Sequence, residues 1–547
     1  MKILSLKKIF QILTIFLSFI IGWSLDPLLQ NCNGVAYVIK IILNSTLIYL
    51  LLEICSRFLL TSIFLGLGLF FLSIVQYIKI AYSYTLSYDL IAALFETTWR
   101  ESSAFRTFNN ISILVLVLLF FTFIIFFLRK KNRITQANTK TILVLVFAFL
   151  FVQLTPLCIN YFFPQIAFNY TTSDVKEDIT RRGLDVKKIG TGINSLYSWP
   201  WTSMTLTINS VYKYFLVDKM EDPALLPSKS SESPLISIFF IGESLRSDHS
   251  PINGYFRNTM PYLKNEKNAI VFPKVLSYAT STIPCVENIL KGHLTNKPGK
   301  NYSAFTHIFK KHGFKVFTIS DELNGNVFLS YRINKTLQGS IDSQYHNILD
   351  IKSLEDQIKI ILNDSSPKKL ILINTVGSHF PYNWLPSPKI FSPCDFTETK
   401  ELSHQKNALI NAYDNTIIYT DTLWKMIFNL CENSPTLLLY ASDHGQSLGE
   451  NNIFMHGGEM NVEEQRIPFF FIWMSDSYLL NNSTSASILN KNKNKLISHE
   501  YIFSSILSMS GIKSEAQEKE FDITNPKCFD LSKHEQKSNL IFDTKSK

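Results

Sequence analysis

Carboxylate and imidazole groups recur in this sequence where apolar runs end. Three such runs each lead into groups of this kind: Glu243 after 236–241, His379 after 370–373, and Asp443 with His444 after 437–441. His456 follows the last pair twelve residues later. Parallel strands of an α/β sheet bring their carboxyl ends to one edge, so we expect these side chains to converge there. Their donor atoms are those that hold a divalent metal ion such as zinc.

Metal-assisted transfer of a phosphoryl or sulfuryl group also needs a nucleophilic hydroxyl. Thr280, Ser281 and Thr282 form a hydroxyl cluster just before Pro284, and apolar residues at helical spacing follow. This pattern predicts a helix start, where free backbone N–H groups stabilise an anion. All three hydroxyls are candidates for the nucleophile, and a simpler role as helix caps fits them equally well.

Short apolar segments alternate with helical patterns after residue 234. We expect strands at 235–242, 315–320, 370–376, 436–441 and 468–474, and helices at 283–292, 303–312, 403–432 and 499–511. This alternation predicts an α/β domain at 234–513 with a largely parallel sheet covered by helices on both faces. The polar, lysine-rich residues 514–547 suggest a loosely held C-terminal tail.

The first 160 residues have a different composition. Five apolar stretches are long enough to span a bilayer, at 8–24, 35–54, 58–80, 111–128 and 141–159, which predicts a transmembrane domain at 1–160. This region holds 13 Lys and Arg against 5 Asp and Glu, and their placement puts the N-terminus in the cytoplasm and the α/β domain outside. We expect residues 81–110 to be an outside loop that contains either an amphipathic helix at the membrane surface or an ordinary capping loop, and residues 161–233 to be a bridging segment.

The net charge of +9 is explained by this topology, because the first 160 residues carry most of it. No basic stripe interleaved with aromatic residues indicates nucleic-acid binding. The seven cysteines form no CxxC or zinc-ribbon spacing, so we expect mostly unpaired thiols.

Four motifs, in order, resemble those of the phosphoethanolamine transferases that modify lipid A and other lipopolysaccharide sugars, within the alkaline-phosphatase/sulfatase superfamily. They are Gly242-Glu243-Ser244-Leu-Arg246 continuing to Asn253-Gly254-Tyr255, Val376-Gly377-Ser378-His379-Phe-Pro381-Tyr382, Asn411-Ala-Tyr-Asp414-Asn415-Thr416, and Ser442-Asp443-His444-Gly445-Gln-Ser447-Leu448-Gly449-Glu450 with His456. The resemblance covers essentially the whole chain apart from the polar tail.

The resemblance implies that Glu243, Asp443 and His444 are zinc ligands. The family pattern around the nucleophile fits Phe272 to Thr282 without gaps, so Thr282 becomes the nucleophile and fourth ligand. His379 and His456 match histidines that touch the phosphoryl group, act as acid or base, or hold a second metal. Asn374 stands where many members have His, which leaves a second zinc ion open.

The implied reaction transfers phosphoethanolamine from phosphatidylethanolamine through a phospho-threonine to a lipopolysaccharide acceptor, lipid A or a core sugar, or to another periplasmic glycan. The implied enzyme is a multi-pass, monomeric protein of the bacterial inner membrane with a periplasmic catalytic domain. Lipid A-specific members usually carry paired cysteines, whereas Cys285 and Cys394 lack obvious partners, so acceptors other than lipid A stay open.

Other interpretations remain. The same machinery fits a glycerophosphate transferase or a phosphodiesterase or sulfatase, although no Arg follows Thr282-x-Pro284 as a sulfatase would require. A non-catalytic membrane binding protein is a further alternative. Ser244 is expected to support its loop, and Asp248-His249, which repeats the Asp-His dipeptide, is expected to be a solvated loop pair.

Overall fold

The computed structural model describes residues 215, 220–226, 233–292, 301–320, 327–346, 350–383, 386–396, 402–457 and 462–533. The chain divides into two compact units, and all of these residues belong to the unit that includes residues 215–547. The five predicted spans, the loop at 81–110 and most of the bridging segment lie outside the described residues. Within the described ranges, no helix is both long and apolar enough to cross a membrane.

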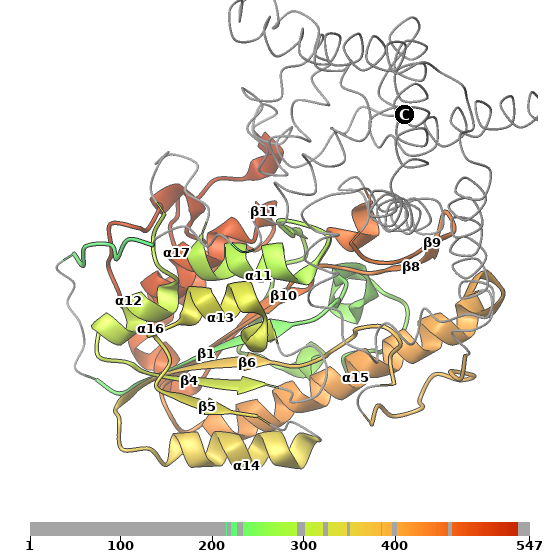
Figure 1. Cartoon of the computed structure of the whole chain (residues 1–547), viewed down its shortest axis with the longest axis horizontal. Helices are drawn as coiled ribbons and strands as arrows, with labels where there is room; N and C mark the ends of the chain where they lie inside the picture. The colour runs from blue at the N-terminus through green and yellow to red at the C-terminus, as the bar shows by residue number, and fades with distance from the viewer. Residues whose placement is uncertain are drawn as a thin grey trace, which may run out of the picture. The chain divides into compact units, whose positions relative to one another are not determined.

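A seven-stranded sheet forms the centre of the described domain (Figure 1), with the strand order β2-β10-β7-β1-β6-β4-β5. Its strands are β1 (Leu235–Gly242), β2 (Ala269–Val271), β4 (Lys315–Ser320), β5 (Ser343–Tyr345), β6 (Lys368–Asn374), β7 (Thr436–Ser442) and β10 (Phe470–Met474). β1 pairs in parallel with both β6 and β7, and β10 runs antiparallel to β7. The predicted, largely parallel sheet is confirmed.

Helices cover both faces of this sheet (Figure 1). On one face lie α11 (Thr282–Lys291), α12 (Phe305–Lys311), α13 (Tyr331–Leu337), α16 (Asp476–Asn492) and α17 (Glu500–Met509); on the other lie α14 (Ile351–Leu362) and α15 (Lys406–Cys431). Two short sheets flank the main one: β3 (Val275–Leu276) with β11 (Ile497–Ser498), and β8 (Ser447–Glu450) with β9 (Ile453–Met455).

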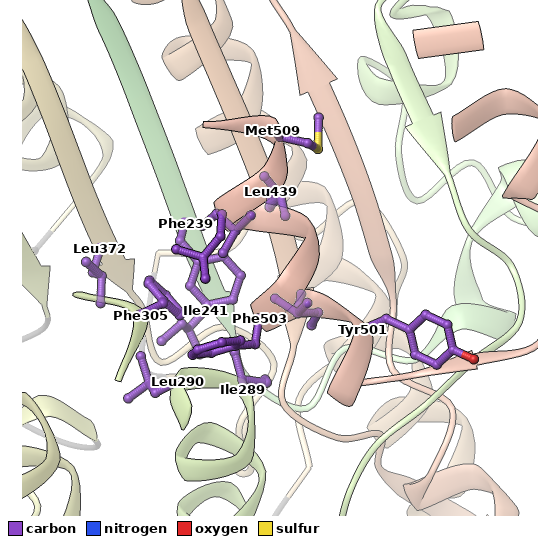
Figure 2. Packing of buried hydrophobic residues seen from close by; sticks show 14 of the residues in the cluster. Phe239, Ile241, Ile289, Leu290, Phe305, Leu372, Leu439, Tyr501, Phe503 and Met509 are labelled. Atoms are coloured by element: carbon purple, nitrogen blue, oxygen red, sulfur yellow. The ribbon is translucent and has the colours of Figure 1, made fainter. Parts of the chain in front are cut away.

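The alternation of side chains along each central strand builds two separate cores. Phe239 and Ile241 of β1 belong to the core under α11, α12 and α17, whereas Ile238 and Phe240 belong to the core under α14 and α15. Figure 2 shows the first core, where Phe239 and Leu439 lie among side chains of the covering helices such as Phe305. Each fully buried side chain of this size contributes roughly 1.5–3 kcal/mol, so both helical layers are fixed on the sheet.

The prediction of a loosely held tail is wrong for residues 514–533. Ala516, Phe521, Ile523, Cys528 and Leu531 are all buried in the core beside α17. Apolar residues spaced among many polar ones supply this anchoring, and the overall polar composition concealed them. The segment therefore belongs to the packed domain.

Candidate metal centre

Glu243 follows the last residue of the central strand β1, and the backbone turns sharply behind it. Ser244 has φ 58, a left-handed conformation that is uncommon for residues with a side chain. In this conformation its N–H donates to Asp443 Oδ1 at 3.0 Å, and its hydroxyl donates to Glu243 Oε1 at 2.7 Å. Ser244 thus supports the loop, as expected, and also contacts both carboxylates directly.

Asp443 and His444 come at the end of β7, beside β1. The N–H of Asp443 donates to the carbonyl of Gly242 at 3.1 Å, which extends the contact between the two strands by one step. His444 Nε2 lies 3.2 Å from Asp443 Oδ2 and 3.6 Å from Glu243 Oε1. The adjacent parallel strands therefore bring Glu243 next to Asp443 and His444, although Asp443 lies 200 residues after Glu243 in the sequence, as the apolar runs predicted.

Thr282 is the first residue of α11. Its Oγ1 lies 3.3 Å from Glu243 Oε2 and 3.3 Å from His444 Nε2. Ser281 occupies the N-cap position, yet its buried hydroxyl makes no hydrogen bond to the helix. Of the candidate hydroxyls, the one on Thr282 reaches the carboxylate and imidazole groups, and a helix-capping role is not observed for Ser281.

His456 and His379 lie next to this group. Ligand atoms of Glu243, His444 and His456 all lie within 4.8 Å of one another. The ring of His456 is 4.2 Å from that of His444 and 5.3 Å from that of His379, measured between centroids. All six predicted site residues are therefore brought together in one place.

The electrostatics of this cluster are those of a cation site. Burial, with the nearby Asp443 carboxylate, raises the pKa of Glu243 well above its ordinary value. Burial lowers the pKa of His444 and lowers that of His456 further, so neither imidazole readily takes a proton to neutralise the carboxylates. A bound cation would stabilise the ionised carboxylates in place of protons.

The hydrogen bonds around His444 show that the donor set fits a metal ion. His444 Nδ1 lies 2.8 Å from the carbonyl of Gly445, so it carries the hydrogen and Nε2 of the neutral ring keeps its lone pair. That lone pair faces carboxylate oxygens, and Asp443 Oδ2 is buried without a hydrogen-bond donor. Lone pairs that converge in this way form an arrangement that a bound cation can satisfy.

The loop after β6 braces the same place. Gly377 has φ 48, and a side chain there would meet the backbone of Glu243 at 3.0 Å, so only glycine permits this approach. The N–H of Ser378 donates to the carbonyl of Glu243 at 3.0 Å. Asn374, where family members often have His, donates to the carbonyl of Ile241 and accepts from the N–H of Val327, both at 3.3 Å.

The expectation of a solvated Asp248-His249 pair is wrong for His249. This ring is buried, and its Nδ1 lies 2.7 Å from Asp414 Oδ1. The fully buried Asp414 also accepts hydrogen bonds from Tyr255 and Arg257 at 2.8 Å each. Asp414 lies in α15, a helix that the sequence predicted. Nothing in the local sequence indicated that Asp414 would pair with residues of the loop after β1.

Two further residues of the site were missed in the sequence. Tyr413 donates through its hydroxyl to the carbonyl of Ser244 at 2.7 Å and accepts from the N–H of Arg246 at 2.8 Å. Gln446 lies 2.7 Å from His456 Nδ1. Their positions within two motifs were the only signal that the sequence offered.

Cys285, Cys394, Cys431 and Cys528 lie in the described ranges and form no disulfide bond with one another. Cys285 follows the nucleophile candidate in α11, and its sulfur lies 3.2 Å from both the N–H and the carbonyl of Ala279. It therefore packs against the loop that leads into α11.

The fold and this cluster define the class of the protein. A model of the sulfatase family matches residues 236–512, which is half of the chain, and the chain belongs to that family. The matched range begins in β1 and ends just after α17, so it contains every residue of the metal centre.

Among known proteins, the relatives of this chain belong to a narrower class than the sulfatase family. The chain is 29% identical over 370 residues to phosphoethanolamine transferase EptA of Salmonella typhimurium, covering 63% of this chain and 65% of that protein. It is 27% identical over 308 residues to the Kdo(2)-lipid A phosphoethanolamine 7''-transferase of the same organism, covering 52% of this chain and 51% of that protein. The chain thus spans less than two thirds of the length of these relatives. The resemblance to phosphoethanolamine transferases is confirmed.

Two solved structures are similar to this chain in fold. The integral membrane protein lipooligosaccharide phosphoethanolamine transferase A from Neisseria meningitidis matches with a TM-score of 0.69 and 19% identity, over 93% of this chain and 97% of that one. The soluble domain of the same transferase matches with a TM-score of 0.50 and 22% identity, over 57% and 98%.

Proposed function

We propose that this protein is a membrane-anchored transferase that moves phosphoethanolamine from phosphatidylethanolamine to a lipopolysaccharide, at lipid A or a core sugar, or to another glycan outside the inner membrane. The observation that carries the proposal is the position of Thr282 Oγ1, 3.3 Å from both Glu243 Oε2 and His444 Nε2. A hydroxyl in that place can bind the same cation as its neighbours. The names of the relatives supply the group that is transferred.

Glu243, Thr282, Asp443 and His444 would hold the ion, with oxygen and nitrogen donors at the count that zinc prefers. The ion would lower the pKa of the Thr282 hydroxyl and polarise the phosphoryl oxygens. The amide of Asn374, which stands where many family members have His, is engaged by the backbone of Ile241 and Val327 and offers no ligand for a second ion, so one zinc ion is the proposed minimum.

Thr282 carries the covalent step. As its Oγ forms a bond to phosphorus, the hydroxyl proton passes to an imidazole and the bond from phosphorus to the diacylglycerol oxygen breaks. That oxygen takes up a proton from an imidazole, His379 or His456. The acceptor oxygen then attacks the phosphorus, the bond to Thr282 breaks, and the hydroxyl is restored. The N-terminal end of α11, with backbone N–H groups that no side chain caps, stabilises the negative phosphoryl group.

The test uses purified full-length protein with phosphatidylethanolamine that carries a fluorescent acyl chain. We expect release of fluorescent diacylglycerol, a drop of at least about a thousandfold in Thr282→Ala, and partial activity in Thr282→Ser. Mass spectrometry should find phosphoethanolamine on the peptide that contains Thr282.

Ser281→Ala is the matched control, because it removes the neighbouring hydroxyl and should leave both the release and the adduct unchanged. Unchanged release in Thr282→Ala, or an adduct on Ser281, would refute the assigned nucleophile. Faster turnover of phosphatidylglycerol or of a sulfate ester than of phosphatidylethanolamine would refute the proposed donor.

A further inference from the structure

His456 is held by a buried glutamine. Its Nδ1 lies 2.7 Å from Gln446 Oε1, and Gln446 is fully buried. The amide nitrogen of Gln446 donates to the hydroxyl of Tyr382 at 3.0 Å. Tyr382 is itself buried and packs against the ring of Tyr413 at 5.4 Å. The oxygen and the nitrogen of the Gln446 amide therefore each have a hydrogen-bond partner, and the buried Tyr382 side chain fixes the orientation of the amide.

A second oxygen near His456 Nδ1 is also an acceptor. Ser244 Oγ lies 3.5 Å from this nitrogen, and its own hydrogen is committed to Glu243 Oε1 at 2.7 Å. Ser244 Oγ therefore faces the imidazole with a lone pair. With two oxygen acceptors beside it, Nδ1 is the nitrogen that carries the hydrogen of the neutral ring.

We propose that Gln446 is a positioning residue that keeps the ring hydrogen of His456 on Nδ1, so that Nε2 is the one nitrogen with a free lone pair. The lone pair of His456 Nε2 can then bind the ion or accept a proton from the acceptor substrate. This nitrogen carries no proton to donate to the leaving oxygen. His379, the other imidazole beside the centre, is left as the proton donor. This assignment of roles rests on the proposed function, whereas the position of the hydrogen does not.

An amide and a carboxylate would orient the His456 ring with different electrostatic consequences. Gln446 orients the imidazole through a neutral oxygen, and so it adds no negative charge beside Glu243 and Asp443. A carboxylate at the same place would also accept from Nδ1, but it would make the ring more basic. The Gln446→Glu variant should therefore preserve the tautomer, and a side chain without polar atoms should not.

The experiment observes the tautomer directly, by nitrogen NMR of metal-free full-length protein whose histidine rings are labelled with ¹⁵N. The His456 signals are assigned by their loss in His456→Gln. We expect a pyrrole-type Nδ1 and a pyridine-type Nε2 in the wild type and in Gln446→Glu. In Gln446→Met, which preserves side-chain length, we expect the two tautomers to mix.

Gln357→Met is the matched control, because Gln357 lies in α14 and bonds to the carbonyl of His346, away from the centre. It should leave the His456 signals unchanged. Should Gln446→Met fail to fold, Tyr382→Phe removes only the hydroxyl that fixes the amide and should broaden or shift the same signals. A pyridine-type Nδ1 in the wild type, or wild-type signals in folded Gln446→Met, would overturn the proposal.

Kinetics separate this proposal from the proposed function. Turnover of phosphatidylethanolamine by Gln446→Met should fall about 10- to 100-fold in kcat with KM unchanged, as for other residues that orient ligands. Absence of any turnover in wild type that has the expected NMR signals would refute the transferase and leave the positioning role standing. A mixed tautomer with wild-type kcat would refute the division of roles between His456 and His379.

Discussion

Ser244 supports the candidate metal centre by adopting a backbone conformation that its side chain disfavours. A residue with a Cβ in the left-handed region persists only where surrounding contacts hold it. Here the N–H is bound by Asp443, the hydroxyl by Glu243 and the carbonyl by the hydroxyl of Tyr413. Tyr413 also accepts from the N–H of Arg246, so one phenol fixes the loop on both sides of Leu245.

Tyr413→Phe should therefore weaken both the fold and the metal site. The buried N–H of Arg246 would lose its acceptor, at a cost of about 1–3 kcal/mol in the free energy of unfolding. Zinc affinity should fall as well, because Ser244 would hold Asp443 less firmly. Urea unfolding and chelator competition measure the two effects. Tyr345→Phe in edge strand β5 is the control, with an expected change within about 0.5 kcal/mol. Equal zinc affinity in Tyr413→Phe and wild type would contradict this role.

At the scale of elements, the buried strands were the best predicted. β1 and β4 have the predicted bounds, and β7 differs by one residue, because continuous apolar runs bounded by polar residues identify central parallel strands. α14 was missed although Ile351, Leu354, Ile358 and Ile361 have helical spacing. Its capping box of Asp350 and Ser353 was also present in the sequence.

The short elements had no comparable signal. β2 and β5 have three residues each at the edges of the sheet, and β8 and β9 form a hairpin interrupted at Gly449. Strands of this length are defined by the neighbour with which they pair. Their own side-chain pattern is too short to show a period.

The packed C-terminal segment makes an element-scale prediction. Ile523 is fully buried beside α17, so Ile523→Ala should lower the free energy of unfolding by about 2–4 kcal/mol through lost burial and a cavity. Ile360→Ala removes the same atoms from a side chain that is 56% exposed, and it should change stability by less than about 0.5 kcal/mol. Thermal unfolding of the full chain compares them. Equal losses in the two variants would contradict the packing of residues 514–533.

For the molecule as a whole, the ends of the apolar runs allowed the candidate ligands to be predicted. The residues that hold these ligands in place could not be predicted in the same way. Glu243, Asp443 and His444 were identifiable because each follows an apolar run that becomes a neighbouring strand. Thr282 was singled out only by resemblance, since three hydroxyls fit the helix start. Tyr413 and Gln446 escaped notice because their contacts join residues that packing alone brings together, as with the 167 residues between Arg246 and Tyr413.

His499 makes the stability of the whole domain depend on pH. Burial lowers its pKa to about 3, and its ring bridges the N–H of Tyr278 and the carbonyl of Ser442. A histidine with a lowered folded-state pKa contributes stability that is fully present above its unfolded pKa of about 6.5. That stability is lost as the pH falls toward about 3, where the folded ring takes up its proton.

Metal-free wild type should accordingly lose free energy of unfolding between pH 7 and pH 4, and His499→Gln should lose less over the same range while starting less stable. Urea unfolding at each pH gives both curves. His307→Gln serves as the comparison, because His307 is only partly buried on α12. Parallel curves for His499→Gln and wild type would show that His499 does not couple to pH.

β1 leaves the ribosome before every other strand of the sheet, yet it sits at the centre of the finished order. Its hydrogen-bonding neighbours are made much later: the partner of Ile241 in β6 comes 133 residues on, and Asp443 comes 199 residues after Ser244. Pairings this distant form late, after a long loop has been closed. On the proposed function, the nascent chain has no place to capture the ion until most of the domain has been synthesised, and loading with metal is expected to be one of the last events of maturation.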